Sequence, residues 1–242
     1  RRQGKKVVYY GHSTMEDFKN SFIGSNLAAP LFKKWICHCY RQGDVVITPT
    51  ENSRELLRNY GLYRKIYALT NGVDTEFFHK TEQASGQFRV LFHIPVDKKV
   101  VISAGHLIQR KGILDFLETA RRMPDVLFLW FGGGNHALIP KEIKKAVAEK
   151  PENVIFAGFM PPVILRDAYC GADAFAFFSY EETEGIVVLE ALSCEIPVIV
   201  RDIPVYEKWL EDGVQVRKAT DPFSYEQALR EILSLSLIHI SE

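Results

Sequence analysis

Short apolar runs of strand length alternate with longer stretches of helical spacing in the first third of the chain. Residues 7–10, 44–48 and 66–69 predict strands, and residues 30–41 and a stretch opening at 49–53 predict the helices between them. Strands that are separated by helices pair in parallel, because the chain has to cross back before it forms the next strand. A parallel sheet is therefore expected in this part.

The helix predicted from Pro30 carries an apolar stripe formed by Leu31, Trp35, Ile36 and Cys39. Packing of this stripe against the sheet is the expected use. The two lysines beside it, next to the tryptophan, also suit contact with lipid headgroups, where each basic residue adds about 1 kcal/mol near an anionic leaflet.

The alternation resumes after residue 98 and continues almost to the end of the chain. Strands are expected at 99–103, 126–131, 154–156, 172–178 and 197–200, and helices at 113–122, 140–150, 163–170, 186–194 and 225–233. The stretch before this series is polar at residues 82–87 and predicts only a short helix at 88–94. Repeated alternation of this kind is typical of a doubly wound parallel sheet.

These patterns divide the chain into parts. Residues 1–75 are expected to be the carboxyl-side part of an amino-terminal Rossmann-like domain, which the chain enters at once and without a methionine. Residues 76–98 are expected to be a linker, and residues 99–233 a second Rossmann-like domain. Residues 234–242 resemble translated sequencing adapter and are expected to be a non-native tail. The predicted fold class is α/β, with two doubly wound parallel-sheet domains, the first incomplete at its amino end.

An acidic loop at residues 179–185 follows the strand predicted at 172–178. Ligands of open parallel sheets lie beyond the carboxyl ends of the strands, so this loop is on the ligand side. The free amides of Gly185, Ile186 and Val187 begin the next helix and would attract phosphate.

Glu182 and Glu190 flank that helix start, with seven residues between them. If the amides bind phosphate, these carboxylates would bind hydroxyl groups. The alternative is that acids near a helix start only complement the helix dipole, at roughly 0.3 to 1 kcal/mol each.

A cationic loop follows the strand predicted at 99–103. Arg110 offers phosphate a planar fork and Lys111 a point charge, although alone they also fit a solvated pair. One cationic and one acidic strand end in the same sheet favour a nucleotide diphosphate-sugar site. His12 follows the strand at 7–10 and is a further candidate contact, although a single loop histidine is also a common surface residue.

The charge is unevenly distributed. Residues 1–75 contain 12 lysines and arginines against 6 acids, and residues 76–242 contain 18 against 24. The basic excess in residues 1–75 suits binding to an anionic partner. The simpler explanation is that the charges only keep the protein soluble. The chain lacks an RNA-binding pattern of aromatic residues and glycines, so we expect a membrane surface and no nucleic acid as the partner.

The four cysteines contain no C-x-x-C pair and are expected to be reduced thiols of a cytosolic protein. Cys37 and Cys39 flank a histidine but lack a second pair of ligands, so we expect no metal site there. The sequence has no run of about 18 apolar residues that would predict a membrane-spanning helix.

Taken together, these residues resemble the retaining GT-B glycosyltransferases of family four. The strongest match is Glu-Thr-Glu-Gly-Ile-Val-Val-Leu-Glu-Ala at 182–191, which resembles the paired-glutamate motif of that family. Asn-Gly-Val-Asp at 71–74, Arg-Lys-Gly at 110–112 and Val-Ile-Phe-Ala-Gly at 154–158 match in the same order. The resemblance covers about residues 5–233, and the chain is most similar to Gram-positive enzymes that glycosylate glucosyl-diacylglycerol.

The resemblance implies a role for each matching position. Glu182 would hold the hydroxyls of the donor sugar, and Glu190 would hold the ribose. The distal phosphate would bind the amides at Gly185, Ile186 and Val187, and the departing diphosphate would bind Arg110 and Lys111. The uracil would contact the backbone of Gly158 and Phe159, and His12 would lie beside the anomeric carbon. These positions would form one donor site.

The resemblance also implies the partners. A UDP-sugar, either UDP-glucose or UDP-galactose, would be the co-substrate, with no other cofactor and no required metal. The acceptor would be a lipid or glycolipid such as monoglucosyl-diacylglycerol, at the anionic cytoplasmic face of the cell membrane. A chain without the first strands of its acceptor domain is expected to bind nucleotide better than it catalyses.

Two departures from the family pattern leave alternatives open. His106 replaces a common arginine, and Thr183 with Glu184 replaces a common Gly-Phe pair, so the sugar stays undefined. The alternatives are a family-four transferase for a soluble or polysaccharide acceptor, and a nucleotide-binding module without turnover. A glycosidase with two carboxylates would leave the cationic loop unexplained.

Overall fold

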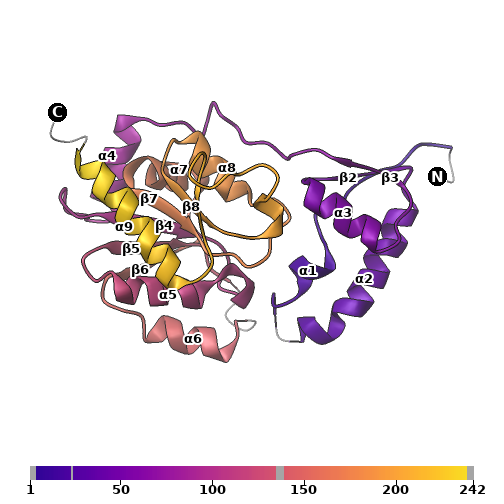
Figure 1. Ribbon diagram of the computed structural model, residues 1–242, viewed down its shortest axis with the longest axis horizontal. Coiled ribbons are helices and arrows are strands. Elements are labelled where there is room, and N and C mark those ends of the chain that lie inside the picture. Colours follow the sequence, from indigo (N-terminus) through magenta and orange to yellow (C-terminus); the bar gives the residue numbers. More distant parts are fainter. Residues whose placement is uncertain (1–3, 23, 135–138, 239–242) are drawn as a thin grey trace.

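The computed structural model describes residues 4–22, 24–134 and 139–238. Figure 1 shows two bodies side by side, with the smaller, amino-terminal one on the right. Residues 69–81 run between them without a helix or strand. Each body has one parallel sheet, of three and six strands, so the α/β prediction with two parallel-sheet domains is confirmed.

The first domain has its three parallel strands in the order β1-β2-β3. The strands are β1 (Val8–Tyr10), β2 (Val45–Thr48) and β3 (Lys65–Ala68), and the helices are α1 (Met15–Phe18), α2 (Ser25–Arg41) and α3 (Glu51–Asn59). Thr50 caps α3, because its hydroxyl accepts from the Ser53 amide at 3.2 Å. The short helix α1 has no counterpart in the predicted pattern.

One face of this sheet packs on helices and the other is open. Val46 and Ile66 face a core that they share with α2 and α3. Side chains alternate between the faces of a strand, so Val8, Tyr10 and Tyr67 lie on the opposite face, where they are 52%, 58% and 55% exposed. Among the described residues, β1 pairs with β2 alone and is an edge strand.

The prediction for α2 was wrong in two respects. The helix begins at Ser25, and Pro30 lies inside it. Of the stripe expected to pack on the sheet, Ile36 is buried, but Leu31 and Trp35 are 69% and 61% exposed. Neighbouring residues of a helix point about 100° apart, so the face that buries Ile36 turns Trp35 outward.

The stretch expected to be polar linker forms a helix. Helix α4 (Glu82–Leu91) begins at a Thr81 cap, whose hydroxyl accepts from the Ala84 amide at 3.1 Å, and it ends before the predicted 88–94 segment does. Ala84 and Phe88 are buried. Phe88 belongs to the core of the second domain, which explains why a polar sequence with only a few apolar positions is helical.

The second sheet has the strand order β6-β5-β4-β7-β8-β9, all parallel. Its strands are β4 (Val100–Ala104), β5 (Leu127–Phe131), β6 (Val154–Gly158), β7 (Ala174–Phe177), β8 (Val198–Arg201) and β9 (Arg217–Ala219). The order reverses between β4 and β7. In sheets of this kind the crevice at the reversal is the ligand site.

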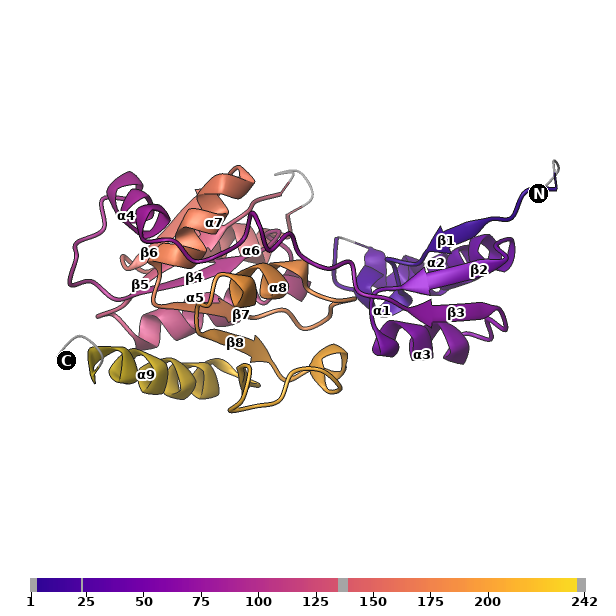
Figure 2. The same cartoon turned by 90° about the horizontal axis from the view of Figure 1, so that it is seen from above.

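Helices cover both faces of this sheet (Figure 2). They are α4, α7 (Pro162–Gly171) and α8 (Ile186–Ser193) on one side, and α5 (Ile113–Arg122), α6 (Lys141–Ala148) and α9 (Pro222–Ile238) on the other. Strand β9 was not predicted, and α9 begins before residue 225 and continues into the expected tail. Residues 239–242 of that tail lie outside the described residues.

Candidate functional site

The cationic loop is fixed against the end of β7 by a glycine. Arg110 and Lys111 belong to the single-turn helix η1 (Gln109–Lys111), which ends at Gly112 with a φ of +71°. A side chain at Gly112 would clash with the carbonyl oxygen of Phe178. Only glycine therefore lets the cations lie directly beside the loop that carries the acids.

Lys111 and Glu182 form an ion pair between the ends of β4 and β7. Their side chains are only 13% and 8% exposed, and the Lys111 ammonium also lies 5.3 Å from the centre of the Phe177 ring. A buried ion pair is stable only while both charges are present or another charge replaces one of them. The cationic loop after β4 and the acidic loop after β7 therefore contact each other through this pair.

Arg110 connects the two domains. Its guanidinium lies 2.8 Å from a carboxylate oxygen of Asp17 on α1 and 3.8 Å from one of Glu182, and it donates to the Glu181 carbonyl oxygen at 2.6 Å. Burial raises the pKa of Asp17, against the lowering effect of Arg110. No sequence signal identified Asp17, because it lies on a four-residue helix and its partner is far away in the chain.

A cavity of about 280 Å³ opens next to Lys111 at the carboxyl ends of β4, β5 and β6. It is lined by Ala104, Gly105, His106, Lys111, Phe131, Gly132, Gly133, Phe159, Met160, Leu165 and Val187. Three predicted site residues, Lys111, Phe159 and Val187, thus share one cavity. Gly158 precedes Phe159 at the end of β6 with a φ of +74°, and its carbonyl oxygen accepts from the Gly132 amide at 2.7 Å.

Glu190 lies within α8, beside the cavity wall rather than among its lining residues. Its carboxylate accepts a hydrogen bond from the Tyr169 hydroxyl at 3.1 Å. Burial raises the pKa of Glu190, and this hydrogen bond partly opposes the shift. The carboxylate is half-buried and has acceptor capacity left for a ligand.

Glycine at position 185 is required by its neighbours. Gly185 has a φ of +83° directly before α8, and a side chain there would clash with the hydroxyl of Tyr206. Tyr206 is fully buried, and among the described residues its hydroxyl has no hydrogen-bond partner. Ile186, the first helical residue, is 46% exposed, so the helix start is open to solvent on that side.

The acidic loop is supported from behind by a buried arginine. Arg201 is 4% exposed, donates to the Phe178 carbonyl oxygen at 3.0 Å and pairs with Asp115. Its guanidinium lies 3.8 Å from the centre of the Tyr180 ring. These contacts fix the carboxyl end of β7, and the sequence pattern had not predicted Arg201 as part of the site.

His12 is not brought into contact with this cluster. The side chain is exposed at the end of β1, and its ring stacks on Tyr10 at 5.9 Å. Among the residues that the structure describes, no hydrogen bond or ion pair joins His12 to Arg110 or Glu182. Its position beside a sugar stays a prediction.

The acidic loop also holds the first domain. The carbonyl oxygen of Thr183 accepts from the Thr50 hydroxyl at 2.9 Å. The carboxylate of Glu184, which is only 3% exposed, accepts from the Thr70 hydroxyl and from the Asn71 amide at 3.2 Å. Residues 183 and 184 were singled out only as departures from a family pattern. Thr183 binds the start of α3 in the first domain, and Glu184 binds the segment that joins the domains.

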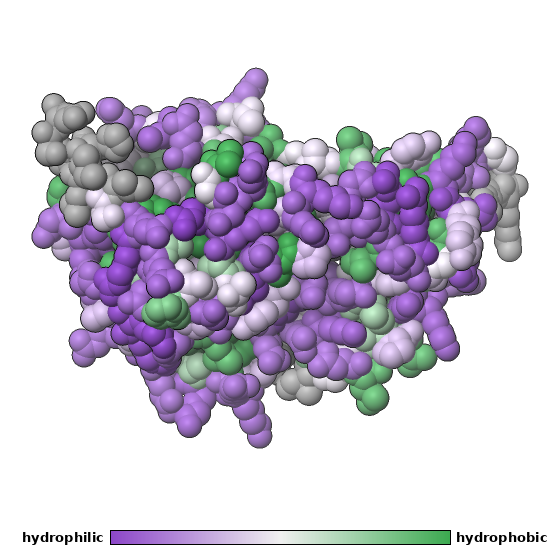
Figure 3. Space-filling view, in the orientation of Figure 1, coloured by the Kyte–Doolittle hydropathy of each residue, from purple (hydrophilic) through white to green (hydrophobic). Residues whose placement is uncertain are grey.

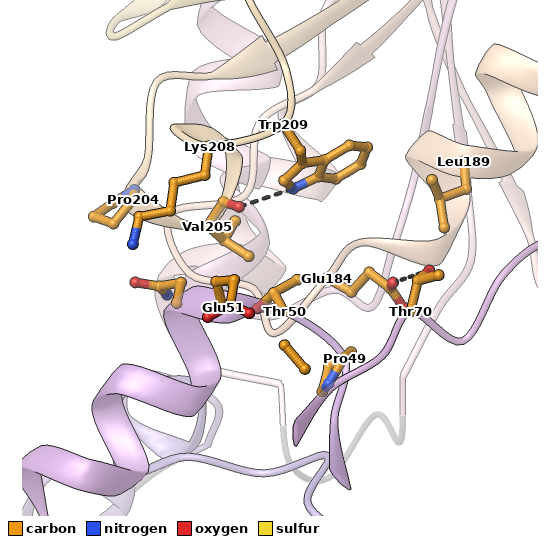
Figure 4. A pocket seen from close by; sticks show the side chains of 12 residues that line it. Pro49, Thr50, Glu51, Thr70, Glu184, Leu189, Pro204, Val205, Lys208 and Trp209 are labelled. Carbon is orange, nitrogen blue, oxygen red and sulfur yellow. Dashed lines mark hydrogen bonds between the residues drawn. The ribbon is translucent and has the colours of Figure 1, made fainter. Parts of the chain in front are cut away.

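A second cavity of about 400 Å³ lies at this junction (Figure 4). It is lined by Pro49, Thr50, Glu51, Asn52, Ala68, Thr70, Glu184, Leu189, Pro204, Val205, Lys208 and Trp209. Trp209 is held in place by a hydrogen bond to the Val205 carbonyl oxygen at 2.9 Å. This cavity shares no lining residue with the first cavity.

Within residues 4–22, 24–134 and 139–238, no cluster of three or more metal-binding side chains is present. No helix in the same part of the chain has the length and apolar composition needed to cross a bilayer.

Two parallel-sheet domains, with a cationic loop and an acidic loop of the second contacting the first, fit the GT-B class of glycosyltransferase folds. Residues 87–239 match the family of group 1 glycosyl transferases, and residues 1–77 match glycosyltransferase family 4. The chain belongs to this glycosyltransferase family.

Relatives of defined activity agree with this assignment. The chain is 39% identical over 233 residues to a processive diacylglycerol alpha-glucosyltransferase of Acholeplasma laidlawii, covering 96% of the chain and 70% of the relative. It is 28% identical over 221 residues to an alpha-galactosylglucosyldiacylglycerol synthase of Streptococcus pneumoniae, covering 87% of the chain and 58% of the relative. The chain therefore spans between about half and three quarters of the length of these relatives.

Solved structures share the fold. HepE of Anabaena, in complex with UDP and glucose, superposes with a TM-score of 0.79 at 19% identity, covering 95% of this chain and 61% of HepE. Sucrose-phosphate synthase of Thermosynechococcus elongatus gives a TM-score of 0.82 at 20% identity, covering 96% and 60%. At this identity the likeness establishes the GT-B fold.

Proposed function

We propose that the protein transfers a hexose from a UDP-sugar to a membrane glycolipid such as monoglucosyl-diacylglycerol, with retention of configuration. The observation that carries the proposal is the Lys111–Glu182 pair at the reversal of the strand order, with Arg110 beside it. The names of the diacylglycerol glycosyltransferases to which the chain is similar support the acceptor class.

The donor would exchange partners with the ion pair. A diphosphate beside Lys111 and Arg110 supplies the negative charge that Glu182 supplies in the free protein, so Glu182 becomes available to accept hydrogen bonds from sugar hydroxyls. The amides at Gly185, Ile186 and Val187 would bind the distal phosphate at the start of α8. This exchange explains why two cations and an acid belong in one site.

The remaining parts of the nucleotide would follow the predicted positions. The base would enter the cavity of about 280 Å³, which Phe159 lines, and would contact the backbone of Gly158 and Phe159. Glu190 would accept from the ribose hydroxyls. His12 would lie beside the sugar from the facing domain, on the ligand side of β1.

The chemistry needs no protein nucleophile. The bond from the anomeric carbon to the phosphate oxygen breaks, the acceptor oxygen bonds to that carbon on the same face, and the departing phosphate takes the acceptor proton. Arg110 and Lys111 stabilise the charge that develops on the phosphate, which is the largest contribution a preorganised site makes. Because these cations hold the diphosphate, we expect turnover to be unchanged by a metal chelator.

The acceptor would reach the site from the cytoplasmic face of the cell membrane. The excess of lysines and arginines in residues 1–75 supports attraction to an anionic leaflet. The protein would then be a peripheral enzyme of the inner membrane face.

The transfer is tested by supplying UDP-glucose or UDP-galactose with monoglucosyl-diacylglycerol in mixed micelles, using a homologue with the full length of the relatives. We expect a diglycosylated lipid with one donor. Absence of a glycolipid product with both donors would refute the acceptor assignment.

A nucleotide-binding module without turnover is the second candidate function. Calorimetry with UDP and the chain itself separates the candidates. If the chain binds UDP but the longer homologue transfers no sugar, the nucleotide-binding module is supported. If the longer homologue forms a product only with a polysaccharide or soluble acceptor, a different transferase of the family is supported.

A further inference from the structure

Helix α2 presents three large apolar side chains to solvent. Leu27, Leu31 and Trp35 are 89%, 69% and 61% exposed. They recur every four residues and therefore form one line along the helix, which we call the α2 outer face. Figure 3 shows hydrophobic residues gathered over α2 at the lower edge of the first domain.

The flanks of this line are basic. Lys34, His38 and Arg41 are exposed on the same helix, and α2 contains no aspartate or glutamate. Another cation, Lys33, lies 4.4 Å from the centre of the Tyr60 ring and faces the protein. An apolar line with cations beside it and no acid is the pattern of helices that lie in the headgroup region of an anionic membrane.

The α2 outer face begins next to the donor site. The segment that leads into α2 carries Phe22, which is 40% exposed, and it contacts the cationic loop. The Asn20 carbonyl oxygen accepts from the Arg110 amide at 3.3 Å, and the Arg110 side chain donates to the Ser21 hydroxyl at 3.3 Å. A surface that rests on α2 is therefore close to Arg110.

The position of α2 is also firmly set. The ring of Phe18 on α1 stacks on Phe32 of α2 at 4.1 Å, and Ile36 and Tyr40 bury the inner face against the sheet. The exposed line is thus not a frayed or loosely packed segment. It is the outer face of a helix whose inner face already contributes to a core.

We propose that the α2 outer face docks on an anionic lipid leaflet, with Leu27, Leu31 and Trp35 among the headgroups and the basic side chains against the lipid charges. The inference rests on the proposed function in that docking would present a membrane acceptor beside Arg110. The charge identifies the partner as an anionic lipid surface. Helix α2 is basic and has no acid, and it belongs to a domain with twice as many basic as acidic residues, so it complements a negative surface.

The test uses the chain as it is, with vesicles of equal parts phosphatidylglycerol and phosphatidylcholine and with vesicles of phosphatidylcholine alone. We expect co-sedimentation with the anionic vesicles, weakened by salt. Of the three tryptophans, Trp130 is 1% exposed and Trp209 is partly buried and hydrogen-bonded to the Val205 carbonyl oxygen at 2.9 Å, whereas Trp35 is 61% exposed. A shift of the fluorescence to shorter wavelength on binding should therefore come mainly from Trp35 and be lost in Trp35→Phe.

The decisive variant combines Leu27→Ser, Leu31→Ser and Trp35→Ser, for which we expect about a tenfold or greater loss of vesicle binding. A matched control replaces three equally exposed apolar residues elsewhere, Tyr63, Val90 and Val96, which are 93%, 75% and 93% exposed. The control should bind vesicles like the unchanged chain. Because all six positions are exposed, both variants are expected to fold, which circular dichroism verifies.

Three outcomes overturn the proposal: unchanged vesicle binding of the α2 variant, equal binding to both kinds of vesicle, and a dimer in sedimentation velocity that the α2 substitutions abolish. The last outcome would assign the face to a second copy. UDP calorimetry on the same samples keeps the two proposals apart, because UDP binding without vesicle binding removes only the docking surface, and vesicle binding without UDP binding removes only the donor site.

Discussion

Single residues determine whether the charges of the proposed donor site are balanced. In the free protein Lys111 is matched by Glu182, and Arg110 is shared between Asp17 and Glu182. The carboxylates thus occupy the cations that a diphosphate would use. For the proposed donor, the affinity would be the difference between two sets of ion pairs, and it is therefore expected to be sensitive to each charge.

We expect Lys111→Ala to lower turnover by about 10² to 10³-fold, because it removes one preorganised cation from the departing phosphate. The steady-state rate with UDP-sugar and micellar glycolipid is the measurement. Lys145→Ala on α6, a lysine that is 74% exposed, is the matched control and should keep full activity. A Lys111→Ala enzyme with the unchanged rate would remove the assignment of this residue.

Glu190 is expected to give the proposed nucleotide site a pH dependence. Burial raises its pKa, so the carboxyl takes up a proton at a higher pH than an ordinary glutamate with a pKa of 4.5. The protonated form is a weaker acceptor for ribose hydroxyls, and we expect UDP affinity to fall as the pH is lowered, starting above that value. Calorimetric titrations with UDP at a series of pH values above and below 4.5, repeated with Glu190→Gln, check this prediction. The variant should bind UDP weakly, and its affinity should change less with pH over the same values.

At the scale of elements, the start of α8 depends on the packing of one glycine against one tyrosine. Gly185→Ala requires a left-handed alanine, which costs about 1 to 2 kcal/mol, and it meets the buried Tyr206 hydroxyl. We therefore expect a loss of unfolding free energy above about 2 kcal/mol and weaker UDP binding.

Tyr206→Phe provides the matched second change. A buried hydroxyl without a partner costs about 1 to 3 kcal/mol, so removing it should leave the protein at least as stable and should partly rescue Gly185→Ala. Urea unfolding of the four proteins of this double-mutant cycle gives the coupling. Strictly additive effects would show that the two residues do not interact.

The elements illustrate what the sequence can and cannot predict. The cationic and acidic loops were predicted to lie at strand ends of one parallel sheet, because each follows an apolar run of strand length. The apolar line of α2 was visible as a period, but a period does not tell which side faces the core, and Leu31 and Trp35 turned out to face solvent. Strand β9 has three residues, two of them charged, and gave no apolar signal.

At the scale of the molecule, the acidic loop joins the two domains. Glu184 accepts hydrogen bonds from Thr70 and Asn71, more than 110 positions earlier in the chain. Such a partnership depends on the final placement of both domains, and neither local propensity nor spacing reports it. The same holds for Asp17 and Arg110.

We expect Glu184→Gln to loosen the domain arrangement, because an amide nitrogen replaces an acceptor opposite the Asn71 amide; leaving one buried donor unsatisfied costs about 1 to 3 kcal/mol. Small-angle scattering should show a larger radius of gyration, and UDP affinity should fall with it. Glu142→Gln on the exposed side of α6 is the control. A compact Glu184→Gln protein with normal UDP affinity would show that the contact does not couple the domains.

Within the part of the chain that the structure describes, β1 pairs on one side only, which has a consequence for handling the chain at high concentration. Edge strands offer free backbone donors and acceptors to other chains, and here the edge borders the open face that carries Val8 and Tyr10. Lys5 and Lys6 precede the strand and oppose the approach of a second copy by charge repulsion. Salt, which screens that repulsion, is therefore expected to promote self-association through strand pairing, so a preparation that stays monomeric at low ionic strength would aggregate as salt is added.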